Sequence, residues 1–144
     1  MEISLFNRQR KVRVPMEWLR ALARVALEEC LRRPALGDGP LPRLEEIEVT
    51  LVADATIARV HRDFMGIPGA TDVITFDHGE IVISTETARD NAARFGRPVD
   101  EELARYVVHG LLHLNGYEDK APADFDRMQR VQEEVLAVCL QKLP

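Results

Sequence analysis

The 144-residue sequence has few cysteines and no long hydrophobic run. Two cysteines, Cys30 and Cys139, are too few for a disulfide framework, which excludes the small disulfide-stapled secreted folds. Because no apolar stretch approaches about 20 residues, no membrane-spanning helix is expected. The segment after Met1 lacks the apolar core of a signal peptide, so we expect a cytoplasmic protein with reduced, buried cysteines.

Lysine is also scarce, since sixteen of the nineteen basic residues are arginine. The net charge of −5 argues against a dedicated non-specific binder of duplex DNA. Residues 1–33 nevertheless hold eight basic residues against four acidic ones. Their densest basic cluster comprises Arg8, Arg10, Lys11 and Arg13. It is either a solvated strand face or a set of phosphate contacts for RNA.

The length and the ordinary proportions of apolar and charged residues predict one globular domain over residues 1–144. Periodicity predicts short strands at residues 3–6, 11–14, 47–52, 72–76 and 80–84. It predicts helices at residues 15–33, 54–64, 85–95, 100–116 and 122–142. This order indicates an α+β fold in which about five helices pack on a small mixed β-sheet of four to five strands.

The segment from Val107 to Asp119 carries the clearest chemical signal. His109 and His113 are four residues apart on a predicted helix, so their imidazole rings point to the same side. Two neutral ring nitrogens at this spacing can hold one metal ion. Gly116 can adopt the left-handed conformation that ends a helix, after which Asp119 can reach the same ion. Three protein ligands leave a coordination position open, which is typical of a catalytic zinc site.

Two other interpretations of this segment stay open. The two histidines can simply pack and hydrogen-bond in the polar slot of an apolar helix, while Asp119 serves as a turn residue or cap. The spacing also resembles that of the metzincin zinc peptidases. Those enzymes carry a glutamate directly after the first histidine as general base, whereas Gly110 cannot transfer a proton. The zinc metallopeptidase interpretation therefore lacks its base.

The chain resembles the YbeY family over almost its whole length. The string from His109 to Tyr117, with Met128 downstream, is similar to the family signature, and residues 71–76 and 79–84 are similar to a second block. The resemblance implies a metal-dependent endoribonuclease that cleaves single-stranded RNA in ribosomal RNA maturation and ribosome quality control. It implies one Zn²⁺ per chain, His109 and His113 as metal-binding catalytic residues, and ribosomal RNA and ribosomal particles as partners.

The chain departs from the family pattern at two positions. The third metal-binding histidine of the family corresponds to Asp119, a competent zinc ligand whose charge makes the ion a weaker Lewis acid. The family's arginine six residues before Thr71 corresponds to Met65. Arg62, one helical turn earlier, is either its catalytic substitute as a phosphate contact or an ordinary exposed residue. These departures motivate the alternative of a non-catalytic ribosome assembly factor.

The residues that transfer protons are not identified by the sequence. Asp72, Glu80 and Glu118 are candidates for the general base because they belong to or adjoin the family motifs. His78 is a weaker candidate for a proton donor. Tyr117 is expected to be a core residue rather than a stacking platform for a base.

Overall fold

The computed structural model describes residues 1–143. Its strands are β1 (Glu2–Asn7), β2 (Glu46–Val52), β3 (Val73–Phe76) and β4 (Glu80–Ser84). Its α-helices are α1 (Met16–Leu31), α2 (Asp54–Met65), α3 (Thr85–Phe95), α4 (Val99–Leu114) and α5 (Pro122–Lys142), and residues Leu41–Arg43 form a short 3-10 helix. The predicted α+β class is confirmed. In this part of the chain, no helix has the length and apolarity required to cross a membrane.

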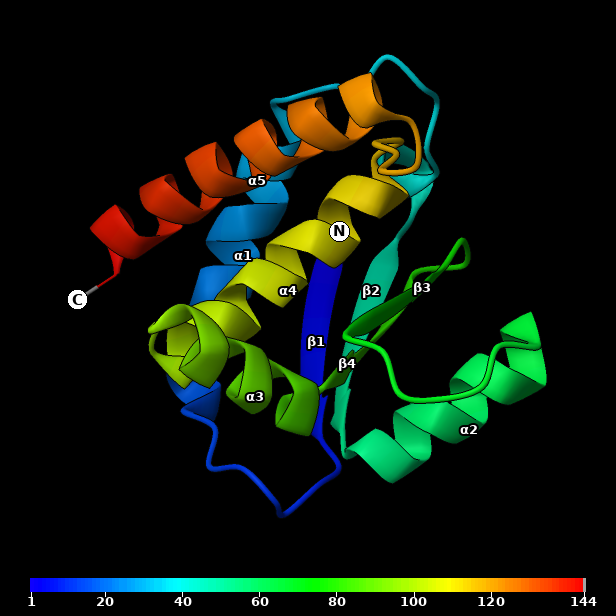
Figure 1. The fold of residues 1–144 in the computed structure, drawn as a ribbon. Helices are drawn as coiled ribbons and strands as arrows, with labels where there is room; N and C mark the ends of the chain where they lie inside the picture. Colours follow the sequence, from blue (N-terminus) through cyan, green and yellow to red (C-terminus); the bar gives the residue numbers. More distant parts are fainter. Residues whose placement is uncertain (144) are drawn as a thin grey trace.

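The four strands form one mixed sheet in the order β1-β2-β4-β3. Strands β1, β2 and β4 are parallel, and β3 runs antiparallel to β4. Because successive strand residues point to opposite faces, Ile81 and Ile83 enter the main core while Val82 faces the other side. Figure 1 shows α1, α4 and α5 stacked on one face and α2 against the other. The core therefore lies mainly on the α4 side.

Helix α4 is the centre of the molecule. It contacts α1, α3, α5, β3 and β4, and most of its side chains are buried. Gly110 allows the closest approach to the sheet, since a Cβ there would lie 2.8 Å from Cγ2 of Ile81. His109 and His113 are the half-buried side chains of the last two turns. The helix that carries both histidines is thus held rigidly against the sheet.

The predicted strand at residues 11–14 is wrong, because residues 8–15 form a loop. The side chain of Gln9 replaces a neighbouring strand as hydrogen-bond partner. Its Oε1 accepts from the main-chain N–H groups of Lys11 and Val12 at 2.9 Å each, and its Nε2 donates to the carbonyl of Val12 at 2.9 Å. Local side-chain bonds of this kind compete with sheet pairing.

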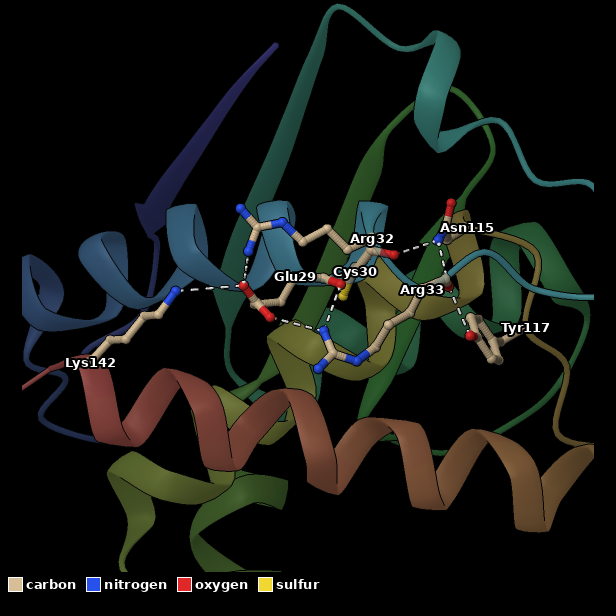
Figure 2. Close-up of polar contacts among 7 residues, drawn as sticks. All are labelled: Glu29, Cys30, Arg32, Arg33, Asn115, Tyr117 and Lys142. Carbon is tan, nitrogen blue, oxygen red and sulfur yellow. Dashed lines mark hydrogen bonds and ion pairs between the residues drawn. The ribbon is translucent and has the colours of Figure 1, made fainter.

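Glu29 is a buried carboxylate that joins α1 to α5 (Figure 2). It accepts hydrogen bonds from Arg32 at 2.7 Å and from Arg33 at 2.9 Å, and Nζ of Lys142 lies 3.6 Å away. The hydrogen bond from Arg33 is the strongest influence on this group, and together with the nearby positive charges it lowers the pKa of Glu29 despite burial. The ionised form is therefore the one that the fold stabilises.

We expect Glu29 to make the folded state sensitive to acid. Its stabilisation is fully present above the pKa of a glutamate in the unfolded chain, about 4.3, and is lost as the pH falls through the lower pKa of the folded state. The difference in unfolding free energy between wild type and Glu29→Gln should stay constant near neutral pH and shrink in acid. Denaturant titrations from neutral pH to about pH 3 measure it. Exposed Glu28→Gln is the control, and a difference that persists unchanged in acid would contradict the expectation.

Candidate metal centre

Three potential metal ligands converge at the carboxyl end of α4. The Nε2 atoms of His109 and His113 are 3.1 Å apart. Oδ2 of Asp119, in the loop before α5, lies 3.2 Å from Nε2 of His113 and 3.7 Å from Nε2 of His109. The structure thus brings together the three residues that the sequence selected as ligands.

The chemistry of this donor set fits a metal ion. Nδ1 of His109 lies 2.7 Å from Oε1 of Gln132, whose amide nitrogen donates to Glu133, and Nδ1 of His113 lies 3.1 Å from the carbonyl oxygen of Tyr117. Since these oxygens only accept, each Nδ1 carries a proton, and in the neutral ring Nε2 is then the lone-pair atom that can bind a metal ion. Two lone pairs and a carboxylate this close repel one another unless a cation lies between them. All three ligand atoms lie within 3.7 Å of one another, close enough for a single ion to be held by all of them.

The environment of His109 favours the neutral ring that a metal ligand requires. Burial lowers the pKa of His109, and the neighbouring His113 lowers this pKa further. The bonds from Nδ1 to Gln132 and to the Tyr117 carbonyl also orient the two rings, as outer-shell partners do in known metal sites. The histidines are therefore preorganised rather than free to rotate.

The three ligands open onto a cavity of about 560 Å³. Its ionisable lining combines five carboxyl groups with three histidines: Asp38, Asp72, Asp77, Glu118, Asp119, His61, His109 and His113. Within residues 1–143, the lining contains no lysine or arginine. An anionic substrate bound here would therefore require positive charge from a metal ion or from the rim of the cavity.

The structure separates the candidate proton-transfer groups. Asp72 and Glu118 line the cavity, and Oδ1 of Asp72 accepts a hydrogen bond from the main chain of Val73 at 2.7 Å. Glu80 lies outside the lining, with its Oε2 3.5 Å from Nε2 of His78 in the turn between β3 and β4. Position therefore favours Asp72 and Glu118 over Glu80.

Arg62 is not among the residues that line the cavity. Its side chain is 64% exposed, and its Nε donates to Asp63 at 3.1 Å. The residues of α2 that line the cavity are instead His61 and Met65, which sequence reasoning did not select. Their spacing of four residues places them on one side of the helix, a pattern that the sequence contains but does not connect with the metal ligands.

The residues after His113 fasten the metal centre to the end of α1 (Figure 2). Nδ2 of Asn115 donates to the carbonyl oxygens of Cys30 at 2.8 Å and Arg33 at 3.3 Å, and the hydroxyl of Tyr117 donates to the Arg33 carbonyl at 2.8 Å. The Cys30 carbonyl also accepts from the main-chain N–H of Arg33 at 3.0 Å, so these side chains add further hydrogen bonds at the end of α1. Tyr117 is buried, as the sequence predicted, and the turn that leads to Asp119 is anchored on both sides.

The fold and the site define a small α+β protein in which three potential metal ligands meet at the end of a helix and face an open cavity, an arrangement that suits a metal-dependent hydrolase. The chain belongs to the YbeY endoribonuclease family, because the family model described as "Endoribonuclease YbeY" matches residues 4–139. The family resemblance of the sequence is thereby confirmed.

Individual relatives agree with this assignment. "Endoribonuclease YbeY" of Bacteroides thetaiotaomicron is 38% identical over 103 residues, which cover 67% of this chain and 75% of the relative. "Endoribonuclease YbeY" of Desulfitobacterium hafniense is 37% identical over 110 residues, covering 64% of this chain and 70% of the relative. The solution structure of TM1509 from Thermotoga maritima matches with a TM-score of 0.62 and 25% identity, covering 97% of this chain and 93% of that one. The names of the Bacteroides and Desulfitobacterium relatives favour an endoribonuclease over a peptidase.

Proposed function

We propose that this protein is a zinc-dependent endoribonuclease that cleaves single-stranded RNA during ribosomal RNA maturation in the cytoplasm, with ribosomal particles as partners. The observation that carries the proposal is the convergence of the Nε2 atoms of His109 and His113, 3.1 Å apart, beside the Asp119 carboxylate. They face an open cavity that is large enough for a nucleotide. Membership of the YbeY endoribonuclease family supports RNA as the substrate.

The side chains of the site have distinct proposed tasks. His109, His113 and Asp119 would hold the ion, which when bound polarises a phosphate and lowers the pKa of a water molecule. Asp119 contributes a negative charge, so the site is a milder Lewis acid than three imidazoles would make. Asp72 and Glu118 are the proposed acceptors of the proton from the attacking oxygen, because both carboxyl groups line the cavity.

Arg62 is the proposed source of the positive charge that binds the substrate phosphates. The cavity lining described between residues 1 and 143 contains no lysine or arginine. Arg62 adjoins His61, which lines the cavity. The exposed guanidinium of Arg62 forms an ion pair with the exposed carboxylate of Asp63. A long, exposed arginine can exchange such a partner for a phosphate, since an exposed ion pair contributes little free energy.

Metal content tests the proposal directly. Elemental mass spectrometry should find about one zinc per wild-type chain and clearly less in Asp119→Ala purified in parallel, because three ligands hold the ion. Asp126→Ala, which removes an exposed carboxylate of α5, is the matched control and should retain its zinc. A wild-type protein that binds no metal after zinc is added back would contradict the enzyme proposal. A folded Asp119→Ala variant with full zinc content would remove Asp119 from the ligand set.

A further inference from the structure

Three aromatic rings form a continuous row beside the metal cavity. They belong to Phe64 at the end of α2, Phe76 at the end of β3, and His78 in the following turn, and we name them the aromatic ledge. The ring centroids of Phe64 and Phe76 are 5.4 Å apart with the planes at 78°, whereas those of Phe76 and His78 are 5.6 Å apart at only 22°. Two segments distant in sequence thus present one row of rings.

The aromatic ledge is open to solvent at both ends. Phe64 is 71% exposed, more than any other phenylalanine within residues 1–143, and the side chain of His78 is 69% exposed. Met65 and Ile67, which follow Phe64 in the chain, are also exposed, at 55% and 45%. Several large exposed apolar side chains in one segment mark a binding site more often than single exposed residues do.

The aromatic ledge is continuous with the cavity wall. On α2, His61 and Met65 line the cavity and Phe64 lies between them in sequence. On β3, Thr75 lines the cavity while the next residue, Phe76, packs against the hydrophobic cluster under α2. Ile74 is two residues before Phe76, belongs to the cluster that Phe76 packs against, and also lines the cavity, so the cavity reaches the face of β3 that carries the ledge. Figure 1 shows α2 and β3 next to each other at this edge of the sheet.

The chemistry around the aromatic ledge favours nucleic acid over an apolar peptide. Arg59 and Arg62 are exposed on the same helix as Phe64 and supply positive charge. In single-stranded RNA, each flat base alternates with a phosphate, so rings that stack bases beside arginines that attract phosphates match its repeating unit. Stacking tolerates every base because each has a π-face. A wholly apolar partner would offer no counter-charge to Arg59, whereas Arg62 would keep its ion pair with Asp63.

We propose that the aromatic ledge of Phe64, Phe76 and His78 is a base-stacking subsite for the single-stranded RNA that is held at the metal cavity. The inference rests on the proposed endoribonuclease function and specifies how its substrate is bound. Bases that lie outside the cavity stack on the exposed rings of Phe64 and His78. The ledge therefore contributes affinity for unpaired RNA and none for duplex RNA, whose bases are already stacked.

Equilibrium binding tests the subsite without relying on catalysis. The probe is a short, fluorescently labelled 2′-O-methyl RNA of mixed sequence, which resists cleavage, measured by anisotropy. Phe64→Ala should weaken binding by about 5- to 100-fold, the range of base–aromatic stacking, while Phe64→Tyr keeps the ring and should stay within about twofold of wild type. Phe125→Ala, which removes an exposed phenylalanine of α5 between two aspartates, is the matched control and should bind like wild type.

Two further measurements separate stacking from a general surface effect. An abasic strand with the same number of phosphates should bind wild type and Phe64→Ala equally, because it has no base to stack. A Phe64→Trp variant should lose fluorescence on binding the single strand but not on adding duplex, whereas wild type, with Trp18 alone, should not respond. If Phe64→Ala weakens binding of the abasic strand as much as it weakens binding of the intact strand, the proposal is overturned.

The outcomes for the aromatic ledge and for the enzyme are distinguishable. If wild type cleaves single-stranded RNA and Phe64→Ala leaves both KM and strand affinity unchanged, the ledge fails and the endoribonuclease stands. If wild type cleaves no RNA but Phe64→Ala still weakens strand binding, the enzyme fails and the subsite stands. If sedimentation shows that Phe64→Ala converts a dimer into a monomer without changing RNA affinity, the ledge is an interface between two copies and the proposal is wrong.

Discussion

His113→Ala is expected to lower the rate of RNA cleavage by about three orders of magnitude or more, because a bound metal ion contributes several kcal/mol to the transition state. His113 is the most central ligand, since its Nε2 lies 3.1 Å from Nε2 of His109 and 3.2 Å from Asp119. Its removal leaves two ligands, which is too few to hold zinc tightly. Single-turnover cleavage of a labelled single-stranded RNA measures the effect.

A graded variant makes this prediction sharper. Gln132→Ala leaves all three ligands in place but removes the acceptor that orients His109, so we expect a loss of about 10- to 100-fold in activity or metal affinity. Far-UV circular dichroism must show that both variants fold. A folded His113→Ala protein that cleaves RNA at the wild-type rate would exclude this metal centre from catalysis. Wild type that never cleaves, with His113→Ala still co-sedimenting with ribosomal particles, would instead support the non-catalytic assembly factor.

Gly39→Ala is expected to be the most destabilising small substitution, by about 3 kcal/mol, the upper end of the usual range for overpacking. A Cβ at Gly39 would lie 2.2 Å from the carbonyl oxygen of Leu114 and 2.3 Å from the main-chain nitrogen of Gly116. All of its nearest atoms are main chain, so no side chain can turn away. The steric overlap can be relieved only if the loop that contains Gly39 moves away from the end of α4, beside the metal cavity. Thermal unfolding should show a melting temperature lower by about 10 °C.

The control for this prediction separates steric overlap from backbone strain. Gly96 has a positive φ of 65°, but a Cβ there would meet nothing within 4 Å. Gly96→Ala should therefore cost only the strain of the left-handed conformation, about 1 kcal/mol. If the two substitutions destabilise the protein equally, the loop at Gly39 moves enough to accommodate a Cβ, and the prediction of a steric penalty is wrong. If the packing is as tight as the distances indicate, Gly39→Ala should also reduce metal content, since Gly39 and Asp119 line the same cavity.

The sequence by itself determined the features that depend on local spacing. The convergence of His109 and His113 follows from the helical period, which holds wherever the helix lies. The return of the chain toward Asp119 follows from Gly116, whose φ is +101°. The strand predicted at residues 11–14 failed because Gln9, outside that window, supplies the hydrogen bonds of its main chain. Alternating apolar residues cannot reveal such a competitor.

Only the tertiary structure decided which groups surround the ligands. Gln132, which orients His109, is 23 positions away in sequence and reaches it because α5 packs on α4. The burial of Ile57 against the sheet sets the orientation of α2. As a result His61 lines the cavity, whereas Arg62 does not. The aromatic ledge likewise exists only because α2 packs against the sheet, which brings the ring of Phe64 to 5.4 Å from that of Phe76. Contacts between distant segments depend on the packing of whole faces, whereas the metal ligands required one helix and one turn.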